Sequence, residues 1–75
     1  MIYDFTYLTE AGIKKFIYNA GGNPTYAGEN VNADASDDDT DWTITKLIWS
    51  DATADGTLTS AQTKSGSWTN RATYF

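Results

Sequence analysis

The clearest alternation of apolar and polar residues lies between Trp42 and Ser50, in the segment WTITKLIWS. A period of two predicts a β-strand, because successive side chains of a strand point to opposite faces. One face carries Trp42, Ile44, Lys46 and Ile48, and the other carries Thr43, Thr45, Leu47 and Trp49. Both faces hold apolar groups, which indicates a central strand covered on both sides or a strand whose second face meets a partner chain.

A hairpin is predicted upstream of this strand. The segment Ile13–Tyr18 (IKKFIY) is β-branched and aromatic, and Asn19–Pro24 (NAGGNP) has the residues of a turn. Thr25–Ala27 follows as a second short strand. A helix over Thr9–Tyr18 is the competing interpretation. Gly12 stands where a capping box needs Glu or Gln, and it would cost such a helix about 1 kcal/mol relative to alanine, so we favour the hairpin.

Turn residues divide the C-terminal third of the chain into further strands. Asp51–Gly56 (DATADG) has the length of a hairpin turn and ends in the dipeptide Asp-Gly. Thr57–Lys64 (TLTSAQTK) combines β-propensity with little demand for burial, which suits a sheet with a solvated face. Ser65–Ser67 interrupts this strand, and Trp68–Phe75 (WTNRATYF) is predicted as the last strand.

Together these segments predict one small all-β domain over residues 1–75. Four to five short strands with regularly spaced turns are typical of a small antiparallel sandwich or a barrel-like meander. Residues 1–12 are compatible with an extended N-terminal arm. Residues 30–41 contain no periodic apolar pattern, so we expect an acidic loop there.

The size and composition of the chain limit how it is stabilised. A domain of 75 residues is marginal alone, and with no Cys it has neither disulfides nor a thiolate zinc site. Aliphatic residues are few, whereas three Trp, five Tyr and three Phe are present, so the core must be rich in aromatic side chains. Oligomerisation is the reinforcement that remains, and aromatic residues are enriched in such interfaces.

The charge and residue types exclude several classes of function. A net charge of -5 with only five Lys and Arg argues against nucleic-acid binding. No apolar stretch approaches the roughly 20 residues of a membrane-spanning helix, and we expect no signal peptide and synthesis in the cytoplasm. The absence of both His and Cys removes the common nucleophile–base pairs, so we do not expect an enzyme.

The acidic loop is a candidate cation site. Asp37, Asp39 and Asp41 have the spacing of the first three ligands of a calcium loop. Trp42 stands where that loop needs Gly, and Ile48 stands where it needs the bidentate Glu. A solvated, self-repelling loop is therefore favoured over weak calcium binding or a salt-bridge patch for a basic neighbour, and we expect no cofactor.

Aromatic and cationic side chains of the later strands are the candidate anchors of the core or of a subunit interface. Stacking of the indoles on sugars or bases is the functional alternative. Arg71 could pair with Asp51 or the acidic loop, or stack on an aromatic ring. The candidate anchors are Trp42, Trp49, Trp68, Arg71, Tyr74 and Phe75.

Residues 13 to 75 resemble a small module of tailed-bacteriophage virion proteins. That module carries segments of the form G-N-P-x-Y-x-G-E, W-R-I-K-x-I-x-Y-D, a glycine turn and W-D-N-R-A-T. The chain departs from it at Thr43, where Arg is expected, and at Trp49, where Tyr is expected. The matching residues are Gly22, Asn23, Pro24, Tyr26, Gly28, Glu29, Trp42, Ile44, Lys46, Ile48, Asp51, Gly56, Trp68, Asn70, Arg71, Ala72 and Thr73.

The resemblance implies a structural component of the virion, on the head surface or in tail or fibre structures, and implies no catalytic residues. The leading hypothesis is a protein present in many copies that binds the capsid or the tail and fibre, or its own copies, through aromatic surfaces and strand edges. A host-surface or glycan-binding module is the first alternative. A small acidic inhibitor that mimics nucleic acid is the second.

Overall fold

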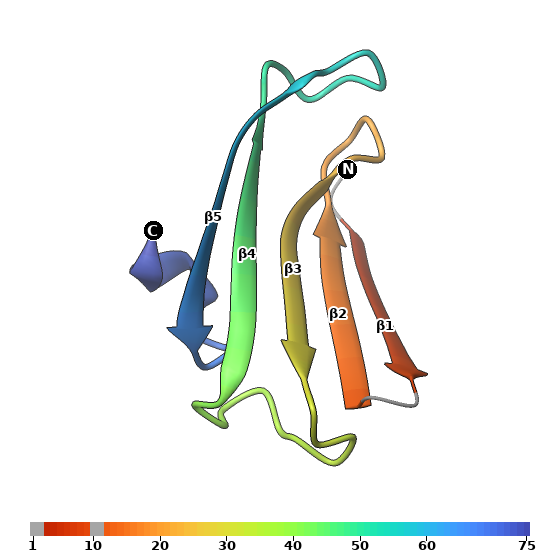
Figure 1. Cartoon of the computed structure of the whole chain (residues 1–75). Coiled ribbons are helices and arrows are strands. Elements are labelled where there is room, and N and C mark those ends of the chain that lie inside the picture. The colour runs from red at the N-terminus through yellow and green to blue at the C-terminus, as the bar shows by residue number, and fades with distance from the viewer. Residues whose placement is uncertain (1–2, 10–11) are drawn as a thin grey trace.

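The structure is a computed structural model that describes residues 3–9 and 12–75, which form one five-stranded antiparallel sheet (Figure 1). The strands lie in the sheet in chain order, so the fold is a meander with β1 and β5 at its edges. The predicted all-β antiparallel class is confirmed. The elements are β1 (Tyr3–Thr9), β2 (Gly12–Tyr18), β3 (Pro24–Asn30), β4 (Trp42–Trp49), β5 (Leu58–Gly66) and the short 3-10 helix η1 (Arg71–Tyr74).

The N-terminal part of the sheet extends the predicted hairpin by one strand. The β2–β3 hairpin is confirmed, and the competing helix is wrong. Residues 3–9, expected in an N-terminal arm, form β1 and pair with β2. Gly12 opens β2 with a φ of 136°, and a β-carbon there would lie 1.9 Å from the carbonyl oxygen of Asn30, so only glycine fits. The remaining arm positions, 1–2 and 10–11, lie outside the described residues.

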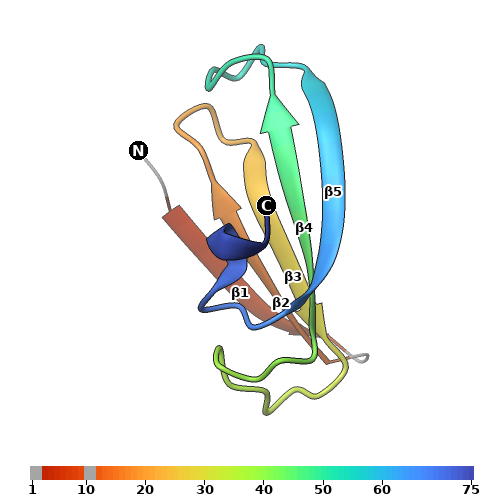
Figure 2. The same cartoon turned by 90° about the vertical axis from the view of Figure 1, so that its left-hand side faces the viewer.

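The C-terminal segment differs from the predicted strand over Trp68–Phe75. β5 continues to Gly66, and the chain then turns back across the sheet and ends in η1 (Figure 2). The ring of Tyr74 packs on Gly66, and the backbone N–H of Ser67 donates a hydrogen bond of 2.9 Å to the Tyr74 hydroxyl. As part of an edge strand, Trp68 would keep much of its surface in water. The turn leaves it only 6% exposed, which favours this path.

This returning segment gives the sheet a covered face, which holds the core. Ile17, Trp42, Ile44 and Trp68 are buried there. Partly buried side chains of Ile13, Tyr26, Ala35, Tyr74 and Phe75 pack around them. A single sheet needs a second layer to bury its apolar face, and here nine residues after β5 and part of a loop supply it.

The opposite side of the sheet is the open face. No strand or helix among residues 3–9 and 12–75 packs across it, because the main contacts join neighbouring strands and join β5 to η1. The strand register places two rows of side chains here. The first row is Lys14, Glu29, Thr43 and Ser65, and the second is Phe16, Ala27, Thr45 and Thr63.

The acidic loop between β3 and β4 is exposed for most of its length, as expected, but hydrogen bonds fix its path. Asn30 Nδ2 donates to Asp41 Oδ1 at 2.8 Å, which joins the two ends of the loop. The indole N–H of Trp42 donates to the carbonyl oxygen of Ser36 at 2.9 Å. The loop therefore closes one end of the covered face, where Ala35 packs against the core.

Candidate functional site

Two of the three predicted tryptophan anchors form the centre of the core. The rings of Trp42 and Trp68 are 5.9 Å apart and inclined by 39°. Their exposed fractions are 0% and 6%, so neither offers surface to a partner or to a sugar. Gly28 makes this pairing possible, because a β-carbon on Gly28 would lie 2.5 Å from the Trp68 ring. Trp42 and Trp68 therefore belong to the core of this chain.

Arg71 adopts the stacked arrangement that the sequence left open. Its guanidinium carbon lies 4.7 Å from the centre of the Trp68 ring and 5.7 Å from that of Tyr26. Its Nη1 donates a hydrogen bond of 3.0 Å to the carbonyl oxygen of Trp68. Arg71 thus fixes the returning segment on the sheet through cation–π contacts, rather than pairing with Asp51 or the acidic loop.

Tyr74 and Phe75 also make contacts within the chain. The hydrogen bonds from the Ser67 side chain and backbone lower the pKa of Tyr74, because they favour the charged form of its hydroxyl. Phe75 packs on Tyr26, with ring centres 6.2 Å apart. Both residues are half-buried, so they hold the second layer in place and keep part of their surface exposed.

The carboxylates proposed for a cation site each have a different partner. Asp37 forms an ion pair with Lys15, whose ammonium also lies 6.0 Å from the centre of the Trp42 ring. Asp39 accepts from the backbone N–H of Ser36 at 2.9 Å. Asp41 accepts from Asn30, as described above. Over the part of the chain that the structure describes, no group of three acidic side chains is placed to hold a metal ion.

The open face contains residues that the sequence analysis did not select as sites. Phe16 and Tyr18 lie on it with ring centres 6.1 Å apart, and both are half-buried. Leu47 lies on the same face of β4, opposite the side that carries Trp42 and Ile44. The sequence did contain a signal for these residues, because the strands over 13–18 and 42–49 carry apolar groups on both faces.

A shallow depression marks the centre of the open face. It has a volume of about 190 Å³, and Lys14, Phe16, Ala27 and Thr45 contribute to its walls. Lys14 and Glu29 face each other across its rim, with Nζ 3.9 Å from Oε2. The surface therefore combines aromatic, small and hydroxyl side chains with one balanced pair of charges.

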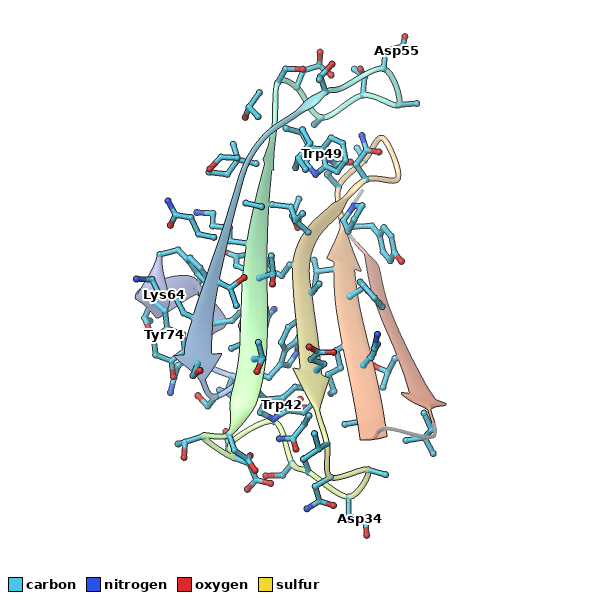
Figure 3. All side chains as sticks on the ribbon, viewed as in Figure 1. Asp34, Trp42, Trp49, Asp55, Lys64 and Tyr74 are labelled. Atoms are coloured by element: carbon cyan, nitrogen blue, oxygen red, sulfur yellow. The ribbon has the colours of Figure 1, made fainter. Side chains whose placement is uncertain are left out.

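Trp49 lies apart from the tryptophan pair, at the end of β4 near the turn between β2 and β3 (Figure 3). It is half-buried, and its indole N–H donates to the carbonyl oxygen of Pro24 at 2.7 Å. Of the predicted anchors, Trp49 is the indole that keeps accessible surface.

Comparisons of the chain with protein families, curated proteins and solved structures found no match. Among the described residues, the structure contains no helix long and apolar enough to cross a membrane.

Proposed function

We propose that this chain is a structural virion protein of a tailed bacteriophage that associates in many copies, with a larger shell or fibre or with itself, through its open sheet face. The observation that carries the proposal is that the chain's own C-terminal segment covers one face of the sheet, whereas no element of the described residues covers the other. A small domain without disulfides gains stability when such a face is buried against another subunit.

The resemblance to virion modules is consistent with the contacts that hold this fold together. Gly28, Trp42, Trp68 and Arg71 all match the module, and they contact one another around the tryptophan pair. These residues hold the fold together through contacts within the chain. Because these four residues are engaged within the chain, the open face and the strand edges remain as the surfaces for assembly.

The chemistry of the open face suits association. Interface centres are enriched in aromatic side chains and depleted in charged ones. Here Phe16, Tyr18 and Leu47 are accompanied by Ala27 and Thr45, and the one described ion pair on the face lies at the rim of the depression. The edge strand β5 adds an extension surface, because its nine residues include a single charge, Lys64.

The test is the mass of the isolated chain by size-exclusion chromatography with light scattering, together with two charge variants. Thr45→Glu places a carboxylate at the centre of the open face, and we expect it to dissociate the oligomer that the wild type forms. Gln62→Glu adds the same charge to an exposed position on the other side of the sheet and should leave the mass unchanged. A wild-type chain that stays a monomer and melts cooperatively would count against self-association. Absence of the chain from purified particles would count against the virion assignment.

A further inference from the structure

A crevice opens where β3 and β4 separate. Their last paired residues at this end are Tyr26 and Lys46. Beyond that pair β3 bends toward the β2–β3 turn while β4 continues (Figure 1). The space has a volume of about 340 Å³ and is open to solvent on one side, so it can contact one face of a small ligand but does not enclose it. Its apolar walls include Leu47, Ile48 and Trp49, and its polar groups include Asn19, Lys46 and Asp51.

Contact between two turns holds the upper end of the crevice in shape. Asn23 Nδ2, in the β2–β3 turn, donates to the carbonyl oxygen of Thr53, in the β4–β5 turn, at 3.1 Å. Gly21 approaches the same peptide so closely that a β-carbon would lie 2.2 Å from the Thr53 carbonyl carbon. The two turns are therefore packed together, and the crevice is formed before any ligand binds.

The indole of Trp49 is fixed in this crevice. Its hydrogen bond to Pro24 spans the gap between β4 and β3, so the ring has one defined orientation. The N–H group is used by that bond, and the ring surface is what remains for a ligand. Figure 3 shows Trp49 between the end of β4 and the β2–β3 turn.

Two polar side chains at the crevice are oriented in the same way. Asn19 Oδ1 accepts from the backbone N–H groups of Gly21 at 3.0 Å and Asn23 at 3.1 Å, which directs its Nδ2 as a donor. Asp51 Oδ1 accepts from the backbone N–H and the hydroxyl of Thr53, which leaves its Oδ2 as an acceptor. The crevice thus presents a fixed amide donor and a fixed carboxylate acceptor beside an aromatic ring.

We propose that this crevice binds one pyranose ring of a neutral carbohydrate. The C–H face of a pyranose packs on an indole ring, and its hydroxyl groups both donate and accept hydrogen bonds, which matches Trp49, Asp51 and Asn19. Lys46 and Asp51 both line the space, so their opposite charges favour a neutral ligand over an anion or a cation. Carbohydrate binding does not require the proposed assembly, although Leu47 lies both on the open face and in the wall of the crevice.

The proposal is tested by NMR titration of the full chain with a panel of methyl hexopyranosides of gluco, galacto, manno and N-acetylglucosamine configuration. The chain has three tryptophans, so three indole N–H signals are available, and Trp49→Phe assigns one of them. We expect a saturable shift of the Trp49 signal with at least one sugar, while the signal of the buried Trp42 stays in place. No saturable shift with any sugar at roughly 50 mM would overturn the proposal. Binding weaker than this would give too little free energy per sugar atom for a specific site.

Two variants locate the binding. Asp51→Asn should weaken it about tenfold by removing a charged hydrogen bond, whereas Asp55→Asn, in the same turn but outside the crevice lining, should leave it unchanged. Trp49→Ala lacks the indole signal, so its sugar binding is followed through backbone amide signals. This variant should also bind about tenfold more weakly. Equal affinity of the wild type, Asp51→Asn and Trp49→Ala would contradict the proposal. So would binding to a glycoprotein that survives periodate oxidation of its sugars, because the occupant would then be peptide.

Discussion

At the scale of single residues, the closeness of Trp68 to the sheet depends on the missing side chain of Gly28. The two residues are distant in sequence, and their contact brings the C-terminal segment onto β3. The guanidinium group of Arg71 lies over the same indole, 4.7 Å from its ring centre. The indole of Trp68 is therefore in contact with both Gly28 of β3 and the guanidinium group of Arg71.

Gly28→Ala should destabilise the chain by about 1–3 kcal/mol, because the added methyl group overlaps the ring of Trp68 in a filled core. Urea denaturation measures the effect. Ala27→Ser, at the neighbouring position on the open face, is the matched control and should change stability by about 0.5 kcal/mol or less. Equal stability of the two variants would show that Trp68 does not pack on β3.

Arg71→Lys should cost about 1 kcal/mol although it keeps the charge. An ammonium group loses the planar stacking on Trp68 and the directed hydrogen bond to its carbonyl oxygen. Near-ultraviolet circular dichroism should report a weaker tryptophan signal. Lys64→Arg, at an exposed position of β5, is the control. If Arg71→Lys matched this control in stability and in its tryptophan signal, the stacking role of Arg71 would be refuted.

At the scale of elements, the strands that alternate locally were predictable and the second layer was not. The segment over 42–49 indicates a strand because apolar and polar residues alternate along it, and the segment over 13–18 indicates one because it is rich in β-branched and aromatic residues. The segment Trp68–Phe75 has the β-propensity of a strand, yet it turns back because Gly66 and Gly28 leave room for Tyr74 and Trp68. That information is distributed over distant positions, so no local pattern contains it.

The candidate sites divide in the same way. Composition indicated that the tryptophans would anchor the core or an interface, but it could not separate the buried Trp42 and Trp68 from the accessible Trp49. The acidic loop was predicted as a loop, whereas its contacts with Lys15 and Trp42 depend on the sheet register.

Removal of the C-terminal segment after Gly66 should abolish cooperative folding. The truncation takes away Trp68 and uncovers Trp42 and Ile44, which are fully buried in the intact chain. Loss of a buried tryptophan alone costs about 3–5 kcal/mol, a large share of the stability of a small domain. Thermal melting followed by circular dichroism is the measurement, and removal of Phe75 alone is the control. A truncated chain with a sharp transition would contradict the assignment of this segment as the second layer.

The β4–β5 turn should weaken in acid. Hydrogen bonds from the hydroxyl and then the backbone N–H of Thr53 lower the pKa of Asp51 in the folded chain. A lowered folded pKa stabilises the turn above the pKa of the unfolded chain, and the stabilisation is lost as the pH falls through the folded value. Wild type should therefore exceed Asp51→Asn in stability at about pH 7, and the difference should vanish at about pH 2. A difference in urea midpoint that persists in acid would refute this account.

At the scale of the whole molecule, the described residues form a sheet with one face covered by the C-terminal segment and one open face, which we propose for assembly. Burial of the tryptophan pair makes the fold self-contained around that core. The open face, with Phe16, Tyr18 and Leu47, is where further apolar area can be removed from water. The depression of the open face and the Trp49 crevice share no lining residue, although Leu47 belongs both to the open face and to the wall of the crevice.

Hydroxyl-radical footprinting with mass spectrometry, applied to the dilute chain and to purified particles, tests the central claim most directly. We predict that Trp42 and Trp68 are protected in both samples, and that Phe16, Tyr18 and Leu47 react in the dilute chain and become protected in the particle. Equal reactivity of the open-face residues in the two samples, or strong oxidation of Trp68 in the dilute chain, would contradict the account.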